Sequence, residues 1–154
     1  MRVLVAYYSL NGHARKIGSE VAKILKADIE EIKDTKDRGN VISWQTSAFE
    51  DELHAPTRIQ KPSKNSQDYD LVVIGTPIWD GLVPAVKAYL STNKFKKIAF
   101  FSTFGAAAED VFYVMSNICK KKPIATLEVQ DRQAFSSEGM ERIKVFCREV
   151  LKNK

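Results

Sequence analysis

The sequence predicts an α/β protein in which one doubly wound parallel sheet of five strands carries helices on both faces. Short apolar runs alternate along the chain with segments whose apolar residues recur at helical spacing, which is the pattern of repeated βαβ units. Three of the runs are apolar throughout, as strands covered on both faces are. Because 154 residues is about the modal size of one domain, we expect residues 1–154 to form a single domain.

Five segments are expected to be strands. The continuous apolar runs at 3–8, 71–74 and 98–101 belong in the interior of the sheet. The runs at 29–32 and 125–130 mix polar and apolar residues, as edge strands do. With right-handed crossovers, these interior and edge positions give the strand order 2-1-3-4-5.

Four segments show the spacing of amphipathic helices, at 14–25, 83–90, 111–118 and 140–151. The stretch 34–68 has no such regularity. Its large apolar residues are scattered and two prolines interrupt it, namely Trp44, Phe49, Leu53, Ile59, Pro56 and Pro62. We expect a short helix near 41–54, followed by an irregular loop that borders the mouth of the site.

An open parallel sheet binds its ligand outside the carboxyl ends of the strands, where the winding reverses. For this strand order the reversal lies between the first and third strands, so three loops are predicted to form the site. They are Ser9-Leu10-Asn11-Gly12-His13-Ala14, Thr76-Pro77-Ile78-Trp79-Asp80-Gly81 and Thr103-Phe104-Gly105.

The first loop places hydroxyl and amide side chains and a glycine directly before a helix. Backbone N–H groups and the positive helix end could surround a phosphate there. An ordinary turn with Ser9 or Asn11 as the helix cap explains the same residues equally well. The loop is neither a Walker loop nor a dinucleotide fingerprint, because both glycine spacings are absent.

The second loop sets Trp79 at the mouth of a central strand, where a planar heterocycle could stack on it. Pro77 stiffens the approach and Gly81 permits a close passage, while the third loop adds Thr103 and Phe104. Each loop taken alone is ordinary turn chemistry. Their convergence at one predicted crevice favours a binding site.

Residues 3–21 (VLVAYYSLNGHARKIGSEV) and 72–90 (VVIGTPIWDGLVPAVKAYL) resemble the corresponding segments of flavodoxins and related proteins that bind flavin mononucleotide, FMN. The resemblance covers nearly the whole chain and implies a flavodoxin-like fold. It implies that FMN is the cofactor and carries the chemistry, with no catalytic residue and no metal required. By resemblance, the phosphate is held by Ser9, Asn11, Gly12, His13 and the backbone of Ala14, and the isoalloxazine ring lies between Thr76–Trp79 and Thr103–Gly105.

The phosphate loop departs from the family at Ala14, where a hydroxyl residue is common. One missing phosphate hydrogen bond costs about 1.5–3 kcal/mol if nothing replaces it. His13 could replace it, although a histidine at a helix start is more often solvated or a cap.

The formal net charge is +5 and the pI is about 9.2. The lysines gather where helices are expected to end, which favours a surface matched to the helix dipoles over a nucleic-acid interface. Because flavodoxins are characteristically acidic, the basic charge favours an acidic redox partner and a raised flavin potential. The apolar run at 3–8 is too short for a membrane span, and two cysteines without metal spacing fit a cytoplasmic protein.

The resemblance and the loops together favour an electron-transfer protein that acts on a redox partner, as a monomer or homodimer. Two alternatives remain. An NAD(P)H-dependent quinone or flavin reductase on the same fold would also admit a nicotinamide, and a flavodoxin-fold binding domain would have lost the cofactor.

Overall fold

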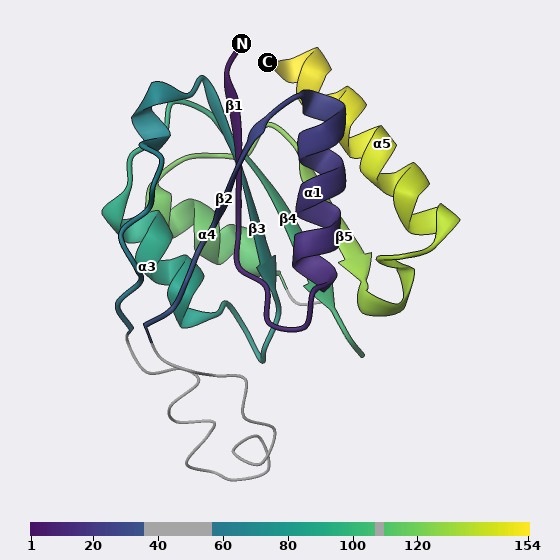
Figure 1. The fold of residues 1–154 in the computed structure, drawn as a ribbon, viewed down its shortest axis with the longest axis horizontal. Helices are drawn as coiled ribbons and strands as arrows, with labels where there is room; N and C mark the ends of the chain where they lie inside the picture. The colour runs from purple at the N-terminus through teal and green to yellow at the C-terminus, as the bar shows by residue number, and fades with distance from the viewer. Residues whose placement is uncertain (36–56, 107–109) are drawn as a thin grey trace, which may run out of the picture.

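A five-stranded parallel sheet with the order β2-β1-β3-β4-β5 forms the centre of the protein in the computed structural model (Figure 1). The structure describes residues 1–35, 57–106 and 110–154. The predicted fold class and strand order are confirmed. The strands are β1 (Val3–Tyr7), β2 (Asp28–Glu31), β3 (Leu71–Pro77), β4 (Ile98–Phe104) and β5 (Thr126–Gln130).

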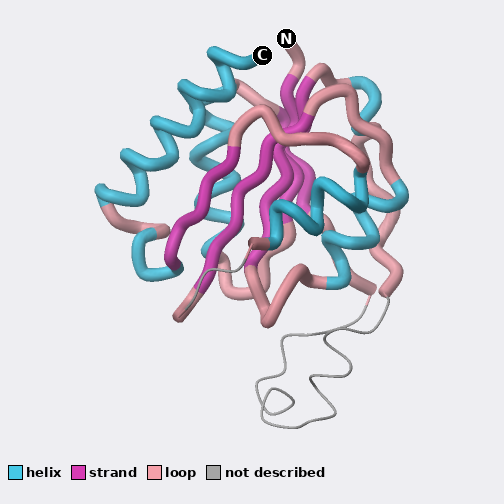
Figure 2. Tube along the Cα trace, turned by 180° about the vertical axis from the view of Figure 1, so that it is seen from behind, coloured by secondary structure: helices cyan, strands magenta, loops and turns pink. Residues whose placement is uncertain are grey.

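Two helices cover each face of the sheet (Figures 1 and 2). The apolar sides of α1 (His13–Leu25) and α5 (Ser137–Asn153) pack on one face, and those of α3 (Pro84–Thr92) and α4 (Val111–Cys119) pack on the other. The four predicted helices are therefore confirmed. The short helix predicted near 41–54 lies outside the described residues. None of the helices in the described part of the chain is long and apolar enough to cross a membrane.

β3 and β4 run further than the apolar runs predicted. Pairing continues through Thr76 with Ser102 and through Pro77 with Thr103, so that residues expected in loops lie on strands. Thr76 and Thr103 are buried although they are polar, and for this reason the apolar pattern of the sequence did not predict their burial. Pro77 ends β3, a position that tolerates a residue without an N–H donor.

Cys147 on α5 is fully buried against the sheet, and this burial raises the pKa of its thiol from an ordinary value of 9.0 to about 12. The pKa of this thiol is higher in the folded than in the unfolded protein. The contribution of Cys147 to the unfolding free energy is therefore complete below the unfolded-state pKa and is lost as the pH rises towards the folded-state pKa. At about pH 10.5 the unfolding free energy should be about 2 kcal/mol lower than at about pH 8 from this group alone. Urea unfolding at both pH values tests this, and Cys147→Ala should show a smaller decline. An unchanged decline in that variant would contradict the assignment.

Candidate functional site

The three predicted loops lie together at the carboxyl edge of the sheet, where β1, β3 and β4 end (Figure 1). Hydrogen bonds join the ends of these strands. The Tyr8 N–H donates to the Gly75 carbonyl at 3.1 Å, and the Ile78 N–H donates to the Thr103 carbonyl at 2.9 Å. Segments far apart in the sequence thus form one continuous edge.

The loop between β1 and α1 closes around the amino end of that helix. The Gly12 N–H donates to Ser9 Oγ at 3.1 Å, and the His13 N–H donates to Asn11 Oδ1 at 3.3 Å. Gly12 is the N-cap with a φ of 94°, a left-handed conformation that glycine adopts without strain. A Cβ added there would meet nothing within 4 Å, so the backbone of Gly12 borders open space.

This loop fits a phosphate. The first N–H groups of a helix have no partner within the helix, and the helix dipole adds positive potential at the same place. The first turn of α1 contains no acidic residue that would repel an anion. Ala14 is 1% exposed and its methyl group packs in the core, so only its backbone could contact a phosphate. Leu10 is half-buried and completes the loop.

The loop after β3 folds into a tight turn that holds Trp79. The Trp79 N–H donates to the Gly81 carbonyl at 3.1 Å, and Ile78 forms a bridge with Leu82. Asp80 and Gly81 both have positive φ, 50° and 107°. The half-buried Trp79 ring meets the edge of the Tyr8 ring at a centroid distance of 5.5 Å and an angle of 76°. The Tyr8 and Trp79 rings therefore form an aromatic surface beside the loop between β1 and α1.

The end of β4 forms the third predicted element. Thr103 is buried, Phe104 is half-buried and Gly105 is exposed. Gln130 Nε2 donates to the Gly105 carbonyl at 3.0 Å, which ties this loop to the end of β5.

Residues that follow β5 reach the same edge, and the sequence analysis missed them. A carboxylate oxygen of Asp131 lies 3.5 Å from His13 Nδ1, and the Phe135 ring meets the His13 ring edge-on at 5.9 Å. The other Asp131 oxygen would lie 3.7 Å from a Cβ added to Gly105. The sequence analysis confined the site to the ends of three strands, and Asp131 follows the edge strand β5, so it was left out.

Three groups of lysines lie at the opposite edge of the sheet. They follow α3, follow α4 and close α5, at Lys94/Lys96/Lys97, Lys120/Lys121/Lys122 and Lys152/Lys154. Their predicted position at helix ends is confirmed. Because each helix runs back against its strands, these ends lie with the two chain termini at the amino edge (Figure 1). These groups therefore lie at the edge opposite to the three predicted loops.

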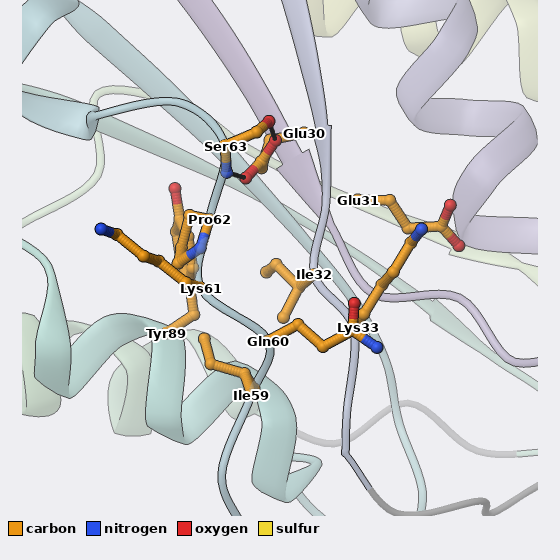
Figure 3. A pocket seen from close by; sticks show the side chains of 10 residues that line it. All are labelled: Glu30, Glu31, Ile32, Lys33, Ile59, Gln60, Lys61, Pro62, Ser63 and Tyr89. Atoms are coloured by element: carbon orange, nitrogen blue, oxygen red, sulfur yellow. Dashed lines mark hydrogen bonds between the residues drawn. The ribbon is translucent and has the colours of Figure 1, made fainter.

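A cavity of about 260 Å³ lies beside the edge strand β2 (Figure 3), and none of its lining residues belongs to the three loops. The Ser63 N–H and hydroxyl both donate to the buried Glu30 carboxylate across it. The Tyr89 side chain rises from α3 past Pro62 (Figure 3), and its buried hydroxyl has no hydrogen-bond partner among the described residues. Desolvation, and then the charge of Glu30, raise the pKa of Tyr89.

Two buried tyrosines offer a matched test of that hydroxyl. Tyr89→Phe removes a buried polar group without a partner and should raise the unfolding free energy by about 1 kcal/mol. Tyr69→Phe removes a hydroxyl that donates to Asp28 Oδ2 at 2.7 Å and should lower it by about 1 kcal/mol. Urea unfolding of both variants measures the difference. Equal destabilisation would mean that the Tyr89 hydroxyl is hydrogen-bonded in solution.

A family model described as flavodoxin matches residues 2–131. The chain belongs to the flavodoxin family. This is an FMN-binding family, so the predicted cofactor is confirmed at the level of the family. No curated protein gives a significant match to the chain.

Solved structures share the fold at low sequence identity. A flavoprotein of Lactobacillus acidophilus in complex with FMN is 19% identical, with 86% of this chain and 94% of that chain covered and a TM-score of 0.67. Oxidised flavodoxin 2 of Bacillus cereus is 16% identical over 100% of both chains, with a TM-score of 0.65. A WrbA-like flavodoxin of Agrobacterium tumefaciens is 14% identical over 99% of both chains, with a TM-score of 0.60.

Proposed function

We propose that this protein binds one FMN at the carboxyl edge of its sheet and serves as an electron-transfer protein. The observation that carries the proposal is the loop at the start of α1, where Gly12 is left-handed, the space beside it is open and the first turn of the helix itself contains no acidic residue. Trp79 stands at the same edge of the sheet. A phosphate site at the start of α1 suits the phosphate of FMN, and the neighbouring aromatic surface suits its isoalloxazine ring.

The residues of the site divide between the two ends of the cofactor. Backbone N–H groups of Gly12, His13 and Ala14 lie at the positive end of α1 and would hold the phosphate; the first two would turn to it from Ser9 Oγ and Asn11 Oδ1, to which they donate in the structure. Ser9 and Asn11, which accept from two of these groups in the structure, shape the loop. When bound, FMN supplies the reversible uptake of electrons.

The two remaining loops would enclose the isoalloxazine ring, with Thr76–Trp79 on one side and Thr103–Gly105 on the other. Trp79 would stack on the ring and exclude water from it. Polar backbone groups of these loops would set the reduction potential by hydrogen bonding to the ring. A carrier requires nothing beyond these elements, and its partner would approach this edge rather than the lysine-rich one.

Steady-state NAD(P)H oxidation with a quinone acceptor separates the carrier from a reductase. The FMN-loaded protein should be reduced reversibly by dithionite but should oxidise NAD(P)H no faster than an equal concentration of free FMN. Sustained turnover above that control would reject the carrier role and indicate a reductase. A protein that takes up no flavin would instead be a binding domain that has kept only the fold.

A further inference from the structure

We propose that Asp131 is a positioning residue for the phosphate site, because its carboxylate orients the His13 imidazole so that His13 donates a hydrogen bond to the FMN phosphate. This inference rests on the proposed binding of FMN. It assigns a role to the end of β5, which contributes no predicted site residue.

One side of the imidazole faces Asp131. His13 is the first residue of α1, next to the Gly12 cap; its buried Nδ1 lies 3.5 Å from Asp131 Oδ1 and makes no hydrogen bond to the described residues. Phe135 packs edge-on against the ring. A proton on Nδ1 would face the Asp131 carboxylate, and the hydrogen bond formed there would set the ring orientation and the tautomer. The second nitrogen, Nε2, is on the far side of the imidazole from Nδ1 and would face the ligand at the helix end.

Asp131 is held in place by the neighbouring loop. It is the first residue of the 3-10 helix η3 (Asp131–Gln133), which begins directly after β5. Its backbone carbonyl accepts from the Ala134 N–H at 3.2 Å. The second carboxylate oxygen lies against Gly105, since a Cβ there would be only 3.7 Å away. Asp131 therefore connects the phosphate loop with the third predicted loop.

The other charged groups near His13 are engaged elsewhere. On α1, Arg15 pairs with Glu31 at 2.6 Å and Lys16 pairs with Glu20 at 3.1 Å. On η3, Arg132 Nε donates to Gln130 Oε1 at 2.7 Å, and the exposed Glu138 lies in the first turn of α5. Within the described part of the chain, Asp131 is the charged group at ion-pair distance from His13.

This arrangement would supply the phosphate contact that Ala14 lacks. The Ala14 methyl group is buried in the core and offers no hydrogen bond. With Nδ1 protonated towards Asp131, Nε2 donates only when the imidazole is positively charged. A charged imidazole would therefore add a phosphate contact that riboflavin cannot use, and this contact should contribute to the preference for FMN over riboflavin.

Fluorescence titrations of the apo-protein with FMN and with riboflavin test the inference. His13→Ala and Asp131→Ala should each weaken FMN binding about tenfold and leave riboflavin binding unchanged. The double variant should lose no more than either single one, because both act through one contact. Asp131→Glu should restore part of the preference, and circular dichroism confirms that each variant is folded.

The outcomes are distinct. If the unaltered protein binds FMN but Asp131→Ala keeps the full preference or strengthens FMN binding, the inference is overturned and the proposed function stands. A loss of FMN and riboflavin binding by the same factor would also overturn it, because Asp131 would then act on the fold alone. If the unaltered protein quenches neither ligand, both the proposed function and the inference fail.

Discussion

Gly75→Ala is expected to lower the free energy of unfolding by about 3 kcal/mol. Gly75 lies in β3 opposite Phe101 of β4, and an added Cβ would lie only 1.9 Å from the Phe101 ring. Phe101 is fully buried, so its ring cannot move aside into solvent. The strands must shift instead, and this shift reaches Thr76 at the start of the predicted ring-binding segment. Urea unfolding measures the loss, and flavin binding should weaken with it.

Gly105→Ala is the matched control for this prediction. Its added Cβ would approach only Asp131 Oδ2, at the ordinary contact distance of 3.7 Å, so the cost should stay below about 1 kcal/mol. Combining Gly75→Ala with Phe101→Leu should recover part of the stability lost by Gly75→Ala, because the smaller side chain leaves room for the methyl group. If Gly75→Ala costs no more than Gly105→Ala, the close packing of Gly75 against Phe101 is not present in solution.

Trp79→Ala is expected to weaken FMN binding between about tenfold and a hundredfold, which corresponds to the loss of one aromatic stacking surface. The Trp79 ring is held by its turn and by Tyr8, so the surface exists before the flavin arrives. Riboflavin binding should weaken by the same factor, because the ring system is common to both ligands. Titrations monitored by flavin fluorescence provide both dissociation constants.

Tyr113→Ala removes another aromatic ring and serves as the control for Trp79→Ala. Tyr113 is 68% exposed on α4, beside Lys120 and Lys121 rather than at the three loops. Its loss should leave both dissociation constants unchanged. Tight FMN binding by Trp79→Ala would show that the isoalloxazine ring does not stack on this residue.

The strand order of the sheet could be predicted from the sequence because helices cover the interior strands on both faces and leave the edge strands partly exposed. Residues 3–7 are apolar and buried throughout, whereas the edge strand β2 exposes Asp28 and Ile29. This contrast orders the strands without any knowledge of their contacts. The polar ends of β3 and β4 escaped the same reasoning, because Thr76 and Thr103 are buried by strand pairing and not by hydrophobicity.

The sequence predicted those parts of the site that follow from the strand order alone. The strand order places Gly12, Trp79 and Gly105 at one edge, as the structure does. The approach of Asp131 to His13 depends on the turn after β5, and no local sequence pattern encodes it. The net charge was equally uninformative about the site, because helix direction carries Lys97 and Lys122 to the opposite edge.

Comparison of FMN with riboflavin in titrations of the apo-protein tests the central claim, which is that the start of α1 holds the phosphate of FMN. The two ligands differ in the phosphate alone, and two charge-assisted hydrogen bonds at about 1.5 kcal/mol each predict that FMN binds at least about a hundredfold tighter. Equal affinities for the two ligands would contradict the phosphate site and the account built on it.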